Sequence, residues 1–220
     1  MAKHKLARFA ENETFSNLFQ HTSYDRVNPE FPLRGKWRSE YFHNDNPIVL
    51  ELGCGKGDYT LALARRNPNA NYIGIDRKGA RLWRGCKDAL EENLTNVAFL
   101  RITIDNIGQY FAEGEVDEIW VTFPDPQIRH ERRRLVSPRF VGYYRQVMKS
   151  GGGILNLKTD SRELYQYVLE AAPEHEWPIL ENVENVYEEE CDEILKNVQT
   201  FYEKMWLAEG RTISYLKIRI

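Results

Sequence analysis

The chain contains few cysteines and no long apolar segment. Its 220 residues include three cysteines, Cys54, Cys86 and Cys191, which are widely separated and form no C-x-x-C pair. This spacing argues against a zinc site or a redox pair, and an odd, scattered set is typical of the reducing cytoplasm. No apolar run approaches the length of a membrane span, and the basic segment 1–9 lacks the apolar core of a signal peptide. We therefore expect a cytoplasmic protein without a metal ion and without membrane contact.

The chain also has no excess of basic residues, since its formal net charge is −3. Taken as an average, this charge argues weakly against a nucleic-acid partner. The distribution is uneven, however, since basic residues cluster at positions 3–8, 34–38 and 129–134, whereas acidic residues gather at positions 181–193. Such asymmetry predicts one basic binding face. The alternative is that each cluster is an ordinary solvated surface.

A glycine-rich segment follows the first apolar run of the chain. Residues 48–52 are apolar apart from Glu51, and Gly53, Gly55 and Gly57 follow at alternate positions. A short apolar run predicts a buried parallel strand, and glycines at this density predict a tight turn that a ligand can approach closely. A second predicted strand at 72–76 ends in Asp76, whose carboxylate could accept hydrogen bonds from ribose hydroxyls.

Two cofactor classes compete for this segment. The dinucleotide fingerprint is G-x-G-x-x-G and places a pyrophosphate at the helix N-terminus, whereas this chain has G-x-G-x-G preceded by Glu51. The full E-x-G-x-G-x-G string resembles the first motif of the class I S-adenosylmethionine (SAM)-dependent methyltransferases. The sequence thus favours SAM over a nicotinamide cofactor, and a glycine turn that binds nothing is the third possibility.

Strands alternate with helices along most of the chain. We expect further strands at 97–102, 118–123 and 154–158, and helices at 58–66, 77–93, 137–149 and 161–172. This order predicts one α/β domain at residues 46–220, with a mostly parallel sheet covered by helices on both faces. Residues 1–45 are expected to form a basic, partly irregular N-terminal arm. The alternating segment 213–220 predicts a half-buried last strand, which the class I methyltransferase fold would place antiparallel.

The fourth predicted strand ends in the string Phe123-Pro-Asp-Pro126, followed by the basic run 129–134. Prolines on both sides restrict the backbone around Asp125. With Thr159-Asp160 and Thr200-Phe-Tyr-Glu203, these strings resemble the bacterial tRNA (guanine-N7-)-methyltransferases over residues 45–220. Ligands of parallel sheets bind at the carboxyl ends of strands. We therefore expect a single rim that carries Gly53, Asp76, Asp125 and Asp160.

The resemblance implies an enzyme that transfers a methyl group from SAM to N7 of a guanosine in the tRNA variable loop, leaving S-adenosylhomocysteine. It implies a set of cofactor-binding residues: Glu51, Gly53, Gly55, Gly57, Asp76, Asp105 and Asp125. Asp125 is also the residue expected at the reaction centre, and either Thr103 or Asp105 is expected on the adenine side. The implied tRNA-binding residues are Arg129, Arg132, Arg133, Arg134, Asp160, Thr200 and Glu203.

Several alternatives remain open. Asp125 could cap a turn, Asp160 could cap a helix, and the arginines could lie in a solvated loop. Arg129 stands where the family usually has a lysine, which would change the geometry of a phosphate contact. At the level of the whole protein, the alternatives are a methyltransferase for another substrate, an RNA-binding module with a degenerate SAM pocket and, last, a nicotinamide oxidoreductase. A monomer and a homodimer are both compatible with the sequence.

Overall fold

The computed structural model describes residues 2–20 and 31–220, with backbone alone for residues 2–5. In these ranges one sheet contains eight strands in the order β1-β4-β3-β2-β5-β6-β8-β7. The strands are β1 (Leu18–Gln20), β2 (Ile48–Leu52), β3 (Asn71–Ile75), β4 (Val97–Arg101), β5 (Glu118–Thr122), β6 (Ile154–Thr159), β7 (Ile179–Val183) and β8 (Ser214–Arg219).

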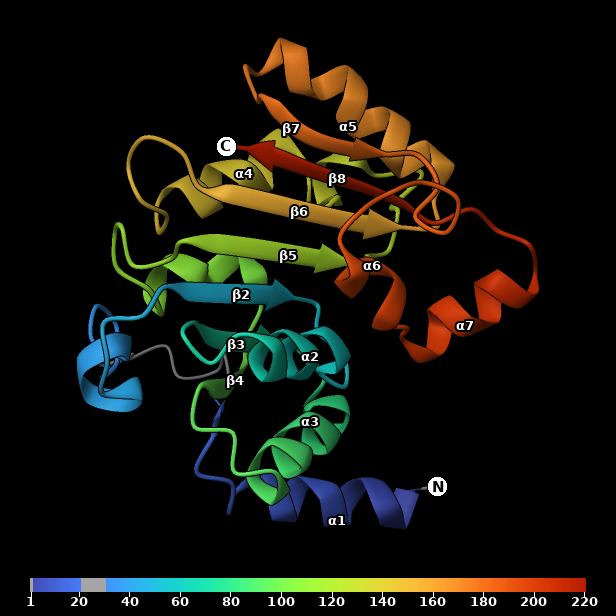
Figure 1. Cartoon of the computed structure of the whole chain (residues 1–220). Helices are drawn as coiled ribbons and strands as arrows, with labels where there is room; N and C mark the ends of the chain where they lie inside the picture. Colours follow the sequence, from blue (N-terminus) through green and yellow to red (C-terminus); the bar gives the residue numbers. More distant parts are fainter. Residues whose placement is uncertain (1, 21–30) are drawn as a thin grey trace.

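The sheet is parallel from β1 to β6, and β8 runs antiparallel to both of its neighbours, β6 and β7. Figure 1 shows the arrowheads of β2, β5 and β6 at one edge, with β8 pointing the other way. This arrangement confirms the predicted mostly parallel sheet with an antiparallel C-terminal strand. It also gathers the carboxyl ends of the parallel strands along one rim, where the expected site residues lie.

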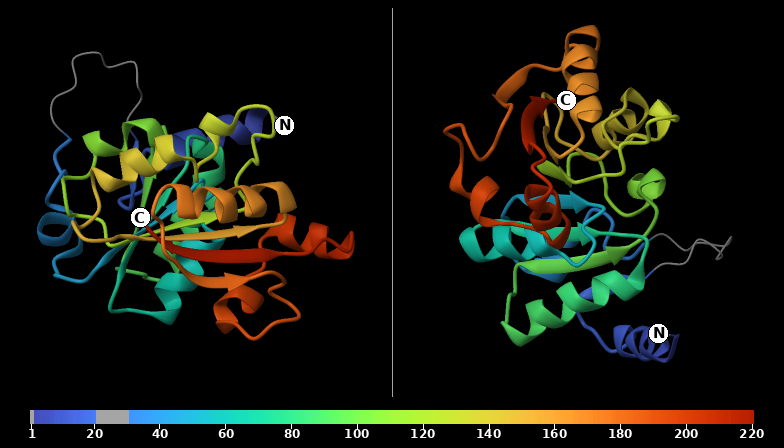
Figure 2. Two further views of the ribbon diagram at one scale, coloured as in Figure 1. Left: turned by 90° about the horizontal axis from the view of Figure 1, so that it is seen from above. Right: turned by 90° about the vertical axis from the view of Figure 1, so that its right-hand side faces the viewer.

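Helices cover both faces of the sheet (Figure 2). The α-helices are α1 (Ala2–Asn12), α2 (Asp58–Arg66), α3 (Gly79–Glu91), α4 (Pro138–Arg145), α5 (Arg162–Glu174), α6 (Glu193–Asn197) and α7 (Phe201–Ala208). Side chains alternate along a strand, so Ile48, Leu50 and Leu52 join the core beneath α4 and α5. Val49 lies on the opposite face, in the core that α2 and α3 cover.

The predicted helices formed for local reasons that the sequence contains. Ser161 accepts a hydrogen bond from the backbone N–H of Leu164 and so caps α5, and Pro138 opens α4 at a position that needs no donor. The predicted strands lie within a residue or so of those observed. Strand β7 and helices α6 and α7 were not predicted.

The N-terminal segment contains more regular structure than the sequence indicated. Helix α1 packs beside α3, where Asn12 donates to the carbonyl of Gly79, and β1 extends the sheet beyond β4. Two basic residues of the predicted arm have structural partners, because Arg34 donates to the carbonyl of Gly108 and Arg38 pairs with Asp117 at 2.7 Å. A further π-helical turn, η1, spans Trp37–Phe42.

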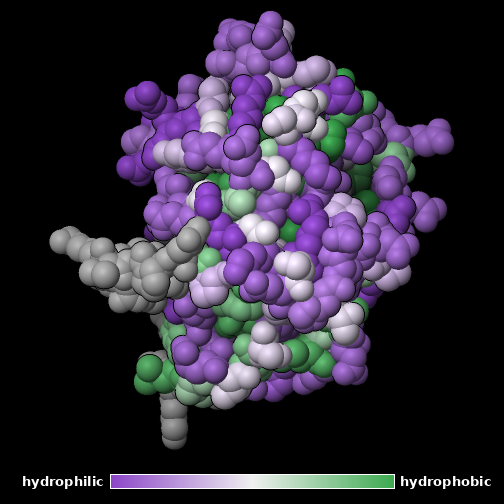
Figure 3. Space-filling model, turned by 90° about the vertical axis from the view of Figure 1, so that its left-hand side faces the viewer, coloured by the Kyte–Doolittle hydropathy of each residue, from purple (hydrophilic) through white to green (hydrophobic). Residues whose placement is uncertain are grey.

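The surface at the amino ends of the parallel strands is mainly hydrophilic. Figure 3 shows this side with small, separate hydrophobic areas among polar residues. Within the part of the chain that the structure describes, no helix is long and apolar enough to span a bilayer. The large exposed apolar side chains of α7 and of the segment after β5 lie elsewhere, namely Ile128, Phe201, Tyr202 and Met205.

Candidate functional site

The glycine loop between β2 and α2 lies at the carboxyl rim of the sheet. The backbone N–H groups of Gly53 and Cys54 both donate to the carbonyl of Ile75, so the loop is anchored to the end of β3. Gly53, Gly55 and Gly57 all have positive φ angles, of 74°, 59° and 78°. Residues with a Cβ adopt this region at a cost, which explains the three glycines.

The three glycines differ in what surrounds them. A Cβ on Gly57 would lie 2.7 Å from the ring of Phe99, whereas a Cβ on Gly55 would meet no atom within 4 Å. Gly57 is therefore needed for close packing beneath the loop. Gly55 faces open space, as expected where a ligand approaches backbone atoms.

Two hollows open beside this loop and meet at Gly53. The first, of about 260 Å³, is lined by the loop, by the end of β5 and by the start of α7, including Glu51, Thr122 and Phe201. The second, of about 270 Å³, is lined by the ends of β3 and β4, including Asp76, Thr103 and Asp105. The two hollows share Gly53 as a lining residue, so they lie on either side of it along the rim.

Glu51 lies at the base of the first hollow and is buried. One carboxylate oxygen accepts from the backbone and hydroxyl of Thr60, and the other accepts from the hydroxyl of Thr122 at 2.9 Å. Burial raises the pKa of Glu51 to about 7, although these three hydrogen bonds act in the opposite direction. The side chain is thus fixed between α2 and β5.

Asp76 connects the glycine loop with the start of α3. One of its oxygens accepts from the N–H of Gly55 at 3.0 Å and the other from the N–H of Lys78 at 2.7 Å. Each oxygen of a carboxylate can accept a second hydrogen bond. Asp76 is therefore held in a fixed orientation with acceptor capacity left for a ligand in the second hollow.

Thr103 and Asp105 both line the far end of the second hollow. Asp105 lies in a 3₁₀ turn, η2 (Ile104–Gln109), where its carboxylate pairs with Arg139 at 3.0 Å. Thr103 and Asp105 therefore both follow β4 and face the second hollow.

Asp125 is exposed at the carboxyl end of β5. One oxygen accepts from the N–H of Gln127 at 3.0 Å, which is the turn-capping role considered as an alternative. The flanking backbone is strained, because Phe123 and Gln127 have φ angles of 48° and 46°. Positive φ is rare in an aromatic residue and is found preferentially at functional sites. Phe123 itself lines the first hollow.

The predicted tRNA-binding arginines divide into two kinds. Arg129, Arg132 and Arg133 are exposed on the segment after Asp125. Arg134 is only 2% exposed, and its guanidinium donates to the carbonyl of Pro126 and to Glu163 at 2.6 Å while lying over the ring of Tyr167. Its position gives Arg134 a structural role: it anchors the segment that carries Asp125.

The remaining predicted residues lie near the end of β6 and at α7. Asp160 pairs with Arg211 at 2.9 Å, and Ser161 rather than Asp160 caps α5. Thr200 caps α7 by accepting from the N–H of Glu203 at 3.1 Å, and it lines the first hollow. Glu203 is completely buried, and its carboxylate contacts Lys158 and Tyr187 inside the protein.

Lys158 was not singled out from the sequence, although it lies at the centre of this region. It is fully buried near the end of β6 and pairs with Glu203 at 2.5 Å. A lysine within the apolar run 154–158 is the signal that could have revealed it, because a buried ammonium requires a compensating partner.

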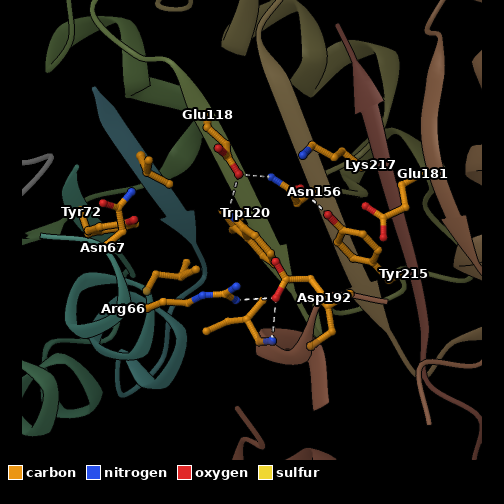
Figure 4. Close-up of a pocket in the computed structure, with 14 residues that line it drawn as sticks. Arg66, Asn67, Tyr72, Glu118, Trp120, Asn156, Glu181, Asp192, Tyr215 and Lys217 are labelled. Carbon is orange, nitrogen blue, oxygen red and sulfur yellow. Dashed lines mark hydrogen bonds and ion pairs between the residues drawn. The ribbon is translucent and has the colours of Figure 1, made fainter. Parts of the chain in front are cut away.

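A separate hollow of about 420 Å³ lies between α2 and α6, toward the amino ends of β2, β3 and β5. Its floor is a hydrogen-bonded group in which Trp120 and Asn156 both donate to Glu118, and Tyr215 donates to Asn156 (Figure 4). Arg66 and Asp192 form an ion pair at its rim. None of the predicted site residues lies here. Across the described part of the chain, no group of three or more His, Cys, Asp or Glu side chains is placed to hold a metal ion.

The fold is shared with solved methyltransferases. The structure of the 16S rRNA methyltransferase KamB superimposes with a TM-score of 0.63 at 19% identity, covering 83% of this chain and 90% of that one. A SAM-dependent methyltransferase from Aquifex aeolicus gives a TM-score of 0.54 at 16% identity, covering 86% and 95%. The strand order, the glycine loop and the rim acids therefore define a class I SAM-dependent methyltransferase fold.

Sequence comparison gives the family within this class. Residues 45–216 match a family model described as "Putative methyltransferase". A tRNA (guanine-N(7)-)-methyltransferase from Christiangramia forsetii is 48% identical over 100% of this chain and 99% of its own length. One from Porphyromonas gingivalis is 48% identical over 93% and 84%. The chain belongs to the tRNA (guanine-N7-)-methyltransferase family.

Proposed function

We propose that this protein transfers a methyl group from SAM to N7 of a guanosine in the variable loop of tRNA. The observation that carries the proposal is the position of Asp125. Its exposed carboxylate lies at the end of β5, directly after the part of that strand that lines the first hollow, and before the exposed arginines 129, 132 and 133. Along one rim the chain thus carries, in order, a hollow for the cofactor, a carboxylate that can accept hydrogen bonds from a base, and arginines that can contact phosphate groups.

The residues at the two hollows fit SAM. Gly55 leaves space for a ligand against the backbone, Asp76 retains acceptor capacity suited to ribose hydroxyls, and the second hollow extends to Thr103 and Asp105 for the adenine. Glu51 and the glycine loop would hold the methionine part. When bound, SAM supplies an electrophilic methyl group carried on a sulfonium.

The acceptor atom needs little activation from the protein. N7 of guanine is an unprotonated acceptor, so no residue has to remove a proton before methyl transfer. The main task of the chain is alignment, which holding the base in one orientation achieves. Asp125 can accept from N1–H or from the exocyclic amine of guanine, and its negative charge favours the positive charge that develops on the ring. This chemistry does not call for a metal ion.

The exposed arginines provide the contacts with the nucleic acid. Arg129, Arg132 and Arg133 are free of the buried network that holds Arg134, so we assign phosphate contacts to these three. Asp160 and Thr200 flank the same rim and are proposed substrate contacts. We place the reaction in the cytoplasm, with tRNA as the partner and with a monomer or a homodimer as the working unit.

Methyl transfer from labelled SAM to an unmodified tRNA transcript tests this proposal. The modified base is then located by cleavage chemistry that is selective for N7-methylguanine. Label at a single variable-loop guanosine is the expected result. SAM binding without label in tRNA would overturn the assignment of the substrate, and absence of SAM binding would favour an RNA-binding role without methyl transfer.

A further inference from the structure

Lys158 is enclosed by groups from several segments of the chain. Its ammonium donates to the hydroxyl of Tyr59 and to the carbonyl of Leu195, both at 2.6 Å, and pairs with Glu203 at 2.5 Å. Lysine has three N–H donors, and these three acceptors satisfy them. The acceptors belong to α2, α6 and α7, so one ammonium joins three helices to the end of β6.

Glu203 is the attachment point of α7. Of all the residues of this helix, Glu203 is the one that is buried, and Phe201 is 63% exposed. The oxygen of Glu203 that contacts Lys158 also accepts from the hydroxyl of Tyr187 at 2.8 Å. Short helices are usually held by an apolar face. In α7 this face is small, with Trp206 packed on Phe123 at 5.2 Å between ring centres and Leu207 packed partly buried against the core, and the buried carboxylate of Glu203 adds a charged attachment.

The position of α7 matters because its start forms part of the cofactor hollow. Thr200, Phe201 and Tyr202 line the first hollow opposite the glycine loop. The ammonium of Lys158 also lies 5.4 Å from the ring of Phe123, the strained residue two positions before Asp125. Lys158 is thus adjacent to the wall of the hollow, to α7 and to the segment that carries the reaction centre. Figure 1 shows α7 beyond the carboxyl ends of the strands, with few other elements around it.

We infer that Lys158 is a positioning residue whose ion pair with Glu203 holds α7 closed against the cofactor hollow. The inference deepens the proposed function and rests on it. Breaking the pair leaves an uncompensated buried carboxylate, which is strongly unfavourable, so α7 would separate from the domain while the sheet remains intact. The wall formed by Thr200, Phe201 and Tyr202 would then be lost, and affinity for the cofactor would fall.

The test compares Lys158→Met with Lys196→Met, a matched change on the adjacent helix α6 where the lysine is not buried. For Lys158→Met we expect an about 10-fold weaker binding of S-adenosylhomocysteine by calorimetry, with a matching rise in KM for SAM and a smaller change in kcat. We also expect faster tryptic cleavage after Lys204 and Arg211, with cooperative melting of the remaining domain. Lys196→Met should match the parent protein in every assay.

A double variant separates electrostatics from packing. Adding Glu203→Gln to Lys158→Met removes the uncompensated charge, so cleavage and affinity should return part of the way to the parent values. Parent-like cleavage and affinity in Lys158→Met would overturn the inference. If that variant does not fold, Glu203→Gln alone replaces it, and parent-like cleavage there would overturn the inference equally. Failure of the parent protein to bind S-adenosylhomocysteine would overturn the proposed function, whereas the cleavage pattern would still decide the role of Lys158.

Discussion

At the scale of single residues, charged side chains from the same sequence strings differ in burial. Arg134 and Glu203 belong to strings that resemble tRNA-binding motifs, yet both are buried and have partners inside the protein. Asp125 and Arg132 come from the same strings and are exposed. The chemical type of a residue is therefore the same in both groups, and burial is what distinguishes Arg134 and Glu203 from Asp125 and Arg132.

Replacement of Asp125 tests the reaction centre directly. In Asp125→Ala the base loses the carboxylate that fixes its orientation, so we expect methyl transfer to fall by about 100-fold or more. S-adenosylhomocysteine should still bind, as calorimetry would reveal, because the glycine loop and Asp76 are unchanged. Asp45→Ala, at an exposed position before β2, is a suitable control. Near-normal turnover in Asp125→Ala would leave this residue with its turn-capping role alone.

Glu51 should make stability depend on pH. Its pKa is about 7 in the folded protein and near 4.5 when unfolded, so the folded state binds the proton more tightly. Stability then falls as pH rises from about 4.5 to 7, because the unfolded chain releases the proton first. The difference corresponds to about 3 kcal/mol at pH 8.

Glu51→Gln removes this ionisation, so the variant should be more stable than the parent at pH 8 and nearly equal to it at pH 4.5. Urea unfolding at the two pH values measures the difference. Glu92→Gln is a control of opposite sign, since the Arg65 ion pair lowers the pKa of Glu92. A Glu51→Gln variant that is equally or less stable at pH 8 would contradict the assigned burial effect.

At the scale of elements, the turn from β2 into α2 combines two separate requirements. The backbone must adopt positive φ at alternate residues, and the helix must pack closely against β4. Gly55 meets the first requirement only. Gly57 meets both, because Phe99 of β4 lies directly beneath it.

Alanine at these two glycines should therefore have different effects. Gly55→Ala adds the cost of positive φ, about 1 kcal/mol, and should weaken cofactor binding more than it lowers stability. Gly57→Ala adds overpacking against Phe99, so we expect a total loss of about 2–4 kcal/mol. Chemical denaturation and S-adenosylhomocysteine calorimetry on both variants provide the comparison. Equal destabilisation would show that the ring of Phe99 yields without cost.

At the scale of the whole molecule, the net charge conceals an uneven distribution of basic and acidic residues. The net charge of −3 does not indicate an RNA-binding protein, whereas the exposed arginines after Asp125 form a local cationic surface. Long-range attraction of a polyanion depends on such local fields. The basic residues Arg34 and Arg38, by contrast, have partners within the fold.

The salt dependence of tRNA binding should distinguish the exposed Arg132 and Arg133 from the buried Arg134. The double variant Arg132→Ala/Arg133→Ala removes two proposed phosphate contacts, so the slope of log K for tRNA against log salt should fall in magnitude by about 1.5. Arg134→Ala should instead lower the melting temperature, because Glu163 and the carbonyl of Pro126 lose their donor. An unchanged slope in the double variant would indicate that Arg132 and Arg133 are ordinary solvated surface residues without phosphate contacts.

Much of the architecture was determined by the sequence alone. Apolar runs of five or six residues, glycines after β2 and the cap at Ser161 are local signals, and local sterics and hydrogen bonding are sufficient to specify the elements they predict. The ordered strings also identified the family and placed Gly53, Asp76, Asp125 and Asp160 at one rim. Helix α7 and strand β7 escaped prediction because their periodic patterns are weak and their stability comes from contacts made elsewhere in the fold.

Only the tertiary structure decided which charged side chains are exposed at the rim and which are buried in contacts within the protein. Lys158 and Glu203 are 45 residues apart in the printed sequence, and no local pattern indicates that they form a buried pair. Arg134 cannot be distinguished from Arg132 and Arg133 by composition, because its burial depends on Glu163 and Tyr167 from another helix. Burial is a property of the packed chain, so the sequence alone could not separate Arg134 and Glu203 from the exposed charges of the same strings.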